Sequence, residues 1–309
     1  MGTNRPSRTA VKIARFMLLL DAVPRLKPVL PKGAAETAEA ILRASGAVRS
    51  RDIGMMRSPR TVRFYEAIEK LLGQGQLLWF GLRKRWLAEA VEQSIAEGAR
   101  QVLVLGSGFD PLAVMVARRH PEVLCVEADA PATANPKRAG IKEAGLACPN
   151  HVILASDLAS SPLEEILRPA GWRAGARSVV VAEGLLMYLR PPDVLKLFSQ
   201  VLHSTSPGSR LAFTSMDADK DNRPQLFFNA GLLNRLIQSA LRAAGEPLRW
   251  GISPASLPAF LGAAGYRPIE QPSLPELRAR FLDPIGLHEE PLAPYEHLCL
   301  AEVVTAAPR

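Results

Sequence analysis

The chain has 309 residues, which is long for one domain but compatible with one large α/β domain and an appendage. Hydrophobic residues make up 48% and charged residues 22%, the balance of an ordinary globular protein, which excludes a disordered or fibrous chain. Three cysteines without paired spacing and five scattered histidines exclude a disulfide framework, and we predict no metal site. Cys125 and Cys299 lie in apolar runs, so we expect buried thiols in a reducing, cytoplasmic compartment.

The positive charge is concentrated at the amino terminus. The formal net charge is +8, and residues 1–32 hold seven basic residues and one acid, so six of the eight net charges lie there. Residues 11–20 are basic and apolar, a pattern that predicts an amphipathic helix, and their apolar run is far too short to span a membrane. Three interpretations stay open. We favour an arm that packs on the domain; a helix that seeks a membrane and a nucleic-acid contact are the others.

Helical segments precede the first predicted strand. Helices are predicted over residues 34–44, 65–72 and 77–96. The arginine-rich stretch 49–63 has few periodic apolar positions, and we predict an irregular segment there. We expect the helices to form a cap over the carboxyl ends of the strands. The chain is then divided into a basic arm (1–32), a helical cap (33–98) and a main domain (99–309).

The stretch 101–131 carries the most informative motif. Residues 102–105 have the pattern of a strand buried on both faces, and they lead into Gly106-Ser107-Gly108-Phe109-Asp110. Pro111 then starts a helix, and the two glycines allow the backbone to approach a ligand closely. A second apolar run ends in Glu127-Ala-Asp129, about 20 residues past the glycines, where nucleotide-binding α/β folds place the carboxylate that holds a ribose.

This turn favours a cofactor that has a ribose but no phosphate. A pyrophosphate needs bare backbone N–H donors at the helix N-terminus, but Pro111 removes one donor and Asp110 adds a negative charge. S-adenosylmethionine (SAM) has a ribose, a positive charge and no phosphate, so the turn favours SAM over a dinucleotide. An ordinary α/β turn without a cofactor is the alternative.

Strands and helices continue to alternate to the end of the chain. Further strands are predicted over residues 151–155, 178–182, 210–215, 265–268 and 297–304, and helices over 162–167, 191–201, 227–244 and 254–264. Regular alternation with apolar strands predicts an α/β fold, a doubly wound Rossmann-like sheet with ligands at the carboxyl ends of its strands.

Five acids follow the predicted strands: Asp110, Glu127, Asp129, Asp157 and Glu183. Buried carboxylates are costly unless they are paired, so five in one crevice suggest a cationic or hydroxyl-rich ligand. For SAM, Asp129 would accept from the ribose hydroxyls, Asp157 would lie near the adenine amino group and Glu183 near the methionine amine. Arg83, on the helix before the first strand, is the candidate cation for the methionine carboxylate.

These motifs resemble the leucine carboxyl methyltransferase family of SAM-dependent methyltransferases, which includes bacterial O-methyltransferases of polyketide biosynthesis. The matching pieces are residues 101–110, Glu127-Ala-Asp-Ala-Pro131 with Lys137 following, Ser156-Asp157-Leu158 and Ala182-Glu-Gly-Leu-Leu-Met-Tyr-Leu189. The resemblance covers about residues 83–215 and implies a class I methyltransferase sheet with an N-terminal helical cap. It also implies a SAM pocket, with S-adenosylhomocysteine (SAH) as product, lined by Arg83, Gly106, Asp129, Asp157, Leu158, Glu183 and Tyr188. The motifs add Ser107, Gly108, Asp110, Glu127 and Gly184 to the predicted cofactor contacts.

The methyl acceptor is less constrained by the sequence. A carboxylate acceptor is ionised at neutral pH and needs no base, whereas a hydroxyl needs one within hydrogen-bond reach, for which Tyr188 is the candidate. Arg60 and Arg223 are candidates to clamp an acceptor carboxylate, and Phe227 and Tyr295 to contact the rest of it. We expect an O-methyltransferase acting on a small molecule in secondary metabolism.

Other functions stay open at this point. The acceptor could be the C-terminal carboxylate of a protein, or RNA, which the basic arm suggests but which we do not favour. A non-catalytic protein with the same fold is another alternative, and a nicotinamide dehydrogenase is a distant one because Pro111 spoils the phosphate turn. The oligomeric state is left open.

Overall fold

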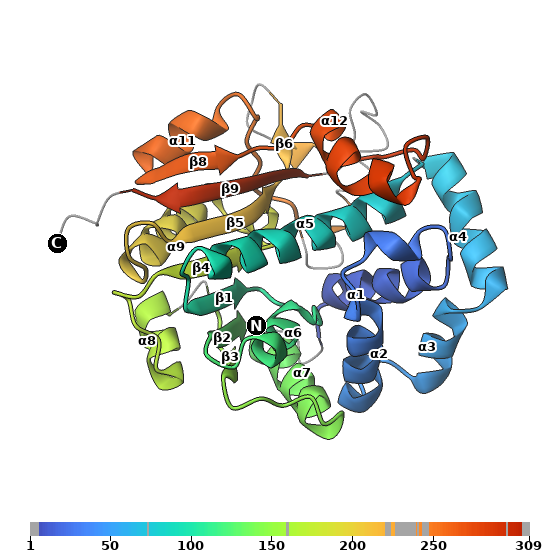
Figure 1. The fold of residues 1–309 in the computed structure, drawn as a ribbon, viewed down its shortest axis with the longest axis horizontal. Helices are drawn as coiled ribbons and strands as arrows, with labels where there is room; N and C mark the ends of the chain where they lie inside the picture. Colours follow the sequence, from blue (N-terminus) through green and yellow to red (C-terminus); the bar gives the residue numbers. More distant parts are fainter. Residues whose placement is uncertain are drawn as a thin grey trace.

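A seven-stranded sheet forms the centre of the protein (Figure 1). The computed structural model describes residues 6–72, 74–158, 161–219, 224–225, 239, 241–242, 247–294 and 296–304. The strand order is β3-β2-β1-β4-β5-β9-β8, and the first five strands in this order are parallel. β9 runs antiparallel to both β5 and β8. The predicted doubly wound α/β fold is confirmed.

The strands match their predicted positions closely. Their bounds are β1 (Gln101–Leu105), β2 (Leu124–Asp129), β3 (His151–Ala155), β4 (Ser178–Ala182), β5 (Arg210–Ser215), β8 (Tyr266–Glu270) and β9 (His297–Val303). A separate two-stranded ribbon pairs β6 (Asp217–Ala218) with β7 (Pro224–Gln225). The central strands β1, β4 and β5 are buried along their whole length, which explains the apolar runs 102–105, 179–182 and 211–213 within them.

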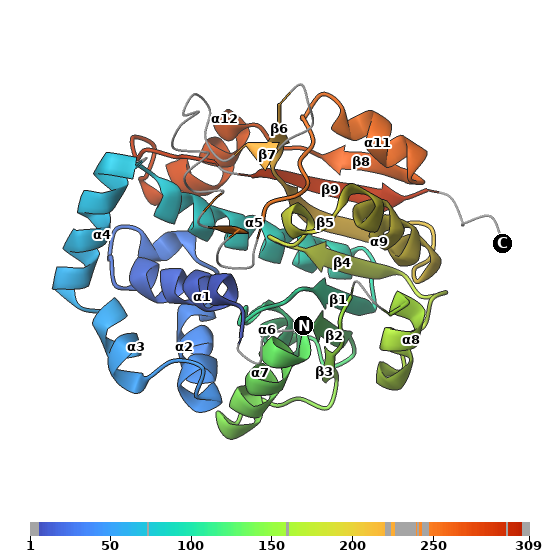
Figure 2. The ribbon, with the colours of Figure 1, turned by 180° about the vertical axis from the view of Figure 1, so that it is seen from behind.

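Helices cover both faces of the sheet, so the molecule has three layers. Alternate strand residues point to opposite faces: Val102 and Val104 join one apolar cluster, and Leu103 and Leu105 join the other. The first cluster includes α5 (Gln76–Ala96), α6 (Leu112–Arg119) and α7 (Pro131–Glu143), and α5 crosses in front of the sheet in Figure 1. The second includes α8 (Leu163–Leu167), α9 (Pro191–His203) and α11 (Leu257–Ala263), the last two brought forward in Figure 2.

Four helices precede α5: α1 (Arg8–Asp21), α2 (Ala34–Ser45), α3 (Ser50–Met56) and α4 (Pro59–Leu72). The prediction of an irregular segment over residues 49–63 is wrong, because α3 and the first five residues of α4 lie there. Local signals mark the start of α4. Pro59 occupies its first position, and the Ser58 hydroxyl accepts a hydrogen bond from the Thr61 N–H at 3.2 Å. Arg57 then ties the turn between the two helices to Glu39 of α2, at 2.7 Å, and to Asp21 of α1.

The basic arm contains the predicted helix, which is α1. Its residues Leu18, Leu19 and Leu20 are at most 1% exposed and belong to the same apolar cluster as α2, α5 and the sheet. α1 therefore packs on the main domain, as favoured from the sequence, and its apolar residues fill part of the core. No helix among the described residues is long and apolar enough to cross a membrane.

Short helical turns complete the chain. They are η1 (Lys27–Val29), η2 (Arg168–Ala170), η3 (Leu186–Tyr188), α12 (Leu274–Leu277), η4 (Arg278–Leu282) and η5 (Asp283–Ile285). The helix predicted over residues 227–244 lies almost entirely outside the described residues. Cys125 and Cys299 are buried free thiols, as predicted.

Candidate functional site

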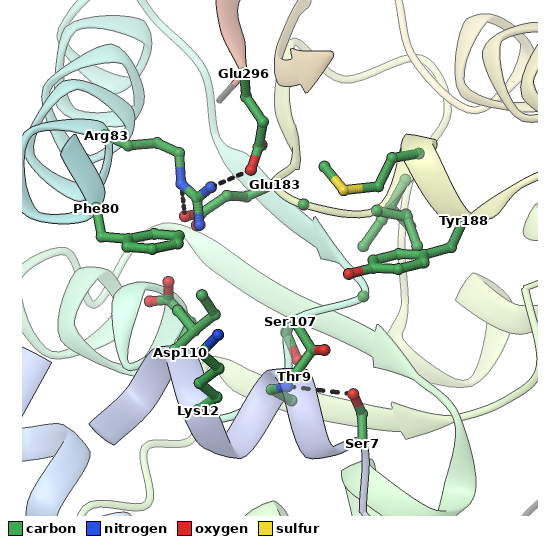
Figure 3. A pocket seen from close by; sticks show the side chains of 18 of the residues that line it. Ser7, Thr9, Lys12, Phe80, Arg83, Ser107, Asp110, Glu183, Tyr188 and Glu296 are labelled. Carbon is green, nitrogen blue, oxygen red and sulfur yellow. Dashed lines mark hydrogen bonds and ion pairs between the residues drawn. The ribbon is translucent and has the colours of Figure 1, made fainter. Parts of the chain in front are cut away.

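A cavity of about 680 Å³ opens where β1 and β4 end. The chain order reverses between these two strands, since β2 and β3 lie on one side of β1 and β5 lies beyond β4. The loops that follow the two strands at such a switch point run in opposite directions, so a crevice forms between them at the carboxyl edge of the sheet. Residues from α1, α5, the β1–α6 turn, the end of β2 and the segment after β4 line the cavity (Figure 3).

The glycine turn after β1 forms the floor of this cavity. Gly106 and Gly108 have φ angles of +63° and +53°, which favour glycine because a side chain at such angles is strained. A Cβ atom on Gly108 would also lie 3.0 Å from the Cβ of Ala10, so α1 packs directly on the turn. Between the glycines, the Ser107 hydroxyl is buried and has no hydrogen-bond partner among the described residues.

Asp129 joins the end of β2 to this turn. Its Oδ2 accepts from the Gly108 N–H at 2.6 Å, and its Oδ1 accepts from the Ala130 N–H at 2.7 Å. Burial raises the pKa of Asp129, and these two N–H groups oppose that shift. The acid predicted to hold a ribose therefore lines the cavity beside the glycine turn, as the spacing predicts.

A buried ionic network forms the wall opposite α1. Arg83 of α5 donates to Glu183 at 2.7 Å and to Glu296, and Lys84 donates to Glu183 at 2.7 Å and to Asp110. Burial alone would lower the pKa of Arg83 and of Lys84, but the carboxylates raise both. Burial would likewise raise the pKa of Asp110, which Lys84 lowers instead. Two cations thus face three carboxylates, which leaves the network one negative charge in excess.

Arg83 lies at the cavity, where two protein carboxylates bind its guanidinium. It lines the cavity, but its Nε donates to Glu183 and its Nη1 donates to Glu296. The sequence predicts that Arg83 pairs with a ligand carboxylate, but it could not show that two protein carboxylates already bind the guanidinium. Glu296 in particular lies 213 positions further along the chain.

Glu127 lies outside the cavity, although it is only two residues from Asp129. It is fully buried and paired with Lys137 of α7 and with His151 Nε2, the latter at 2.8 Å. Burial would raise the pKa of Glu127, but Lys137 and His151 lower it to about 2. Lys137 Nζ also donates to the Asp110 carbonyl at 2.6 Å, so this pair holds α7 against the glycine turn.

The remaining predicted residues divide into three groups. Gly184 and Tyr188 line the cavity with Ser107, Gly108 and Asp110. Asp157, Leu158 and Arg60 do not: the first two follow β3 at the same edge of the sheet, and Arg60 is exposed on α4. Arg223, Phe227 and Tyr295 lie outside the described residues. No group of three or more His, Cys, Asp or Glu side chains among the described residues could hold a metal ion.

Helix α1 supplies cavity residues that the sequence analysis did not single out. Ser7, Thr9, Ala10, Lys12 and Ile13 all line the cavity. Lys12 reaches into it from α1 in Figure 3, its Nζ lies 5.3 Å from the centre of the Phe16 ring, and burial lowers its pKa. The sequence predicts an amphipathic helix that packs on the domain, but it does not show which of its residues reach a cavity.

Comparisons with known proteins agree with the fold and with the motifs. The family model for leucine carboxyl methyltransferase matches residues 35–202, more than half of the chain. A proposed SAM-dependent methyltransferase of Mycobacterium marinum is 33% identical over 133 residues, 42% of this chain and 43% of that protein. A second, from a Parafrankia species, is 29% identical over 203 residues, 61% of this chain and 58% of that protein. The chain thus spans about half the length of the curated relatives that it matches.

A solved structure supports the same fold. A DUF574 family protein from Streptomyces avermitilis aligns with a TM-score of 0.53 at 14% identity, over 87% of this chain and 97% of that one. At this identity the likeness concerns the fold alone. The matched family region contains Arg83, the glycine turn, Asp129 and Glu183, which are the residues that build most of the cavity. The chain belongs to the leucine carboxyl methyltransferase family.

Proposed function

We propose that the protein is a SAM-dependent O-methyltransferase that methylates a carboxylate or a hydroxyl group of a small molecule. The observation that carries the proposal is the hydrogen bond between Asp129 and Gly108 at the edge of the cavity. It brings a carboxylate that can accept from a ribose to a glycine turn that admits a ligand close to the backbone.

The residues of the cavity fit SAM. Its volume of about 680 Å³ falls within the usual range of small-molecule sites. The Ser107 hydroxyl has no partner in the part of the chain that the structure describes, so it offers a hydrogen bond to a ligand. The excess negative charge of the ionic network, together with Asp129, suits a ligand that carries positive charge.

Different residues of the cavity would contact different parts of the cofactor. Asp129 would hold the ribose, and the backbone of Gly106 and Gly108 would lie along the adenosine. When bound, SAM would supply an electrophilic methyl group on its sulfonium. α1 covers the cavity from one side and Tyr188 borders it from another, so that both would limit the access of water.

The cations that line the cavity favour an acidic acceptor. Lys12 of α1 and Arg249 are both among the lining residues, and neither was predicted. A carboxylate bound by them would need no base, whereas a hydroxyl acceptor would need one, and Tyr188 is the candidate. Arg223, Phe227 and Tyr295 remain predictions from the sequence. Membership of the leucine carboxyl methyltransferase family supports the same class of acceptor.

A role in nucleic-acid binding is not supported by the arm. Arg15 pairs with Asp52, and Lys27 pairs with Asp21 at 2.7 Å, so part of the basic charge is used within the protein. Lys12 lines the cavity, although its side chain is exposed.

The test is a transfer assay with SAM labelled on the methyl group and a panel of small carboxylic acids and phenols. We expect label in an organic product that mild alkali releases as methanol, because esters hydrolyse and ethers do not. Tyr188→Phe should leave a carboxylate reaction nearly unchanged and slow a phenol reaction strongly. A protein that binds SAH but labels no acceptor, protein or RNA would contradict the enzyme assignment and support a binding protein.

A further inference from the structure

Glu296 belongs to the cavity although it lies far from every motif in the sequence. It directly precedes β9, which is antiparallel to β5, with His297 paired to Ser215. The first residues of β9 therefore lie at the edge where the parallel strands end. In this way the fold brings the side chain to the cavity, where it lies beside Arg83 (Figure 3).

The two glutamates of the ionic network differ in how their oxygens are used. Glu183 accepts from Arg83 with Oε1 and from Lys84 with Oε2, at 2.7 Å each. Glu296 accepts from Arg83 with Oε1, while its Oε2 has no hydrogen-bond partner within the described part of the chain. Glu296 is only 7% exposed, so its carboxylate is largely removed from bulk solvent.

The uncompensated charge of the network is therefore located on Glu296. Two cations satisfy both oxygens of Glu183, and Asp110 accepts from Lys84 and from the Leu112 N–H, at 2.7 Å for the latter. A buried anionic oxygen without a donor is costly, and a ligand that brings a cationic N–H group would offset that cost. Of the groups on SAM, the ammonium is the only cation that can donate a hydrogen bond.

We propose that Glu296, rather than Glu183, is the side chain that binds the ammonium group of the cofactor. The inference rests on the proposed function, since it deepens the description of the same cofactor site. It reassigns a contact that the charge pattern of the sequence gives to Glu183, because both oxygens of Glu183 already accept from cationic groups, whereas Glu296 Oε2 has no donor among the described residues.

The test is calorimetric binding of SAH and of its desamino analogue, which lacks only the α-amino group, to the full chain. Wild-type protein should prefer SAH between about tenfold and a hundredfold, the range for a hydrogen bond to a charged group. Glu296→Gln should bind the two compounds within about threefold of each other and the analogue as well as wild type does. Glutamine keeps an oxygen for Arg83, so the substitution removes the charge and leaves that contact in place.

Glu302→Gln is the matched control. Glu302 lies on β9 and pairs with the exposed Arg267 at 2.7 Å, away from the cavity, so this variant should retain the full preference for SAH. Equal binding of both compounds by wild type, or an undiminished preference in Glu296→Gln, would overturn the inference and leave the cofactor assignment intact. A loss of affinity in Glu296→Gln that is equal for both compounds would also overturn it, as the mark of a structural role. Failure of wild type to bind SAH or its analogue would remove the proposed function and the inference with it.

Discussion

Glu127 and Asp129 lie two residues apart on β2, and their surroundings give them different tasks. Asp129 is the last residue of the strand, where its carboxylate meets the glycine turn. Glu127 lies deeper in the sheet, where Lys137 and His151 enclose it. The sequence predicts both as cofactor contacts, because spacing places two acids at the strand end but does not show which of them a lysine ten residues later will bind.

Asp129→Asn should weaken the binding of SAH by about tenfold or more, because the amide removes the charge and one acceptor for a ribose hydroxyl. The amide oxygen can still accept from the Gly108 N–H, and water can take over the lost bond of the exposed Ala130, so the melting temperature should change little. Asp193→Asn, at a surface pair with Arg190 on α9, is the control and should bind as wild type does. An Asp129→Asn protein with full affinity would mean that the ribose lies elsewhere.

Glu127→Gln should lower the free energy of unfolding by about 3–5 kcal/mol, since it leaves the ammonium of Lys137 buried without its anion. Urea unfolding measures this loss. The variant that remains folded should bind SAH normally, because Glu127 does not line the cavity. A variant as stable as wild type that no longer binds SAH would instead confirm the sequence prediction for this residue.

The ion pair of Glu127 with Lys137 also makes the free energy of unfolding depend on pH. The pKa of Glu127 is about 2 in the folded protein, below the usual 4.5, so the folded state takes up this proton less readily than the unfolded chain. Its contribution is complete above the unfolded value and is lost as the pH falls towards 2. Urea titrations between about pH 6 and pH 3 should show a steeper loss of stability in wild type than in Glu127→Gln. Parallel curves for the two proteins would contradict this account.

At the level of elements, α1 has two functions: it packs in the core and it lines the cavity. The composition of the helix does not show which residues serve which function. Leu18, Leu19 and Leu20 fill the core, while Lys12 and Ala10, about two to three turns earlier, line the cavity. A helix that covers a ligand site must be anchored by its own packing, so stability and binding should be linked through α1.

Leu19→Ala should cost about 2–5 kcal/mol in the free energy of unfolding, the usual result of emptying a buried leucine site. Leu195→Ala is the matched control: it makes the same change in α9 at a position that is 54% exposed, and its effect should stay within about 0.5 kcal/mol. Denaturant unfolding of both variants tests the anchoring of α1. Equal stabilities would mean that the arm is not part of the core.

At the level of the whole molecule, the sheet could be predicted well because its signals are local. Short apolar runs predict β3, β4 and β5 with the bounds that the structure has, and the glycine turn predicts which edge of the sheet holds the site. The contacts of Arg83 with Glu296 and of Lys137 with Glu127 could not be predicted, because they depend on which elements the topology brings together. Helix α3 and the start of α4 were not predicted, because their signals are caps and turns rather than an apolar stripe, whereas the helix predicted over residues 65–72 is the second half of α4.

The most direct test of this account is calorimetric titration of the full chain with SAH, with NAD as the control. The account predicts micromolar binding of SAH at one site and no binding of NAD. Asp129→Asn should reduce the affinity for SAH in the same experiment. Absence of SAH binding to a folded protein would contradict the central claim, and it would leave the fold and the family membership without the proposed cofactor.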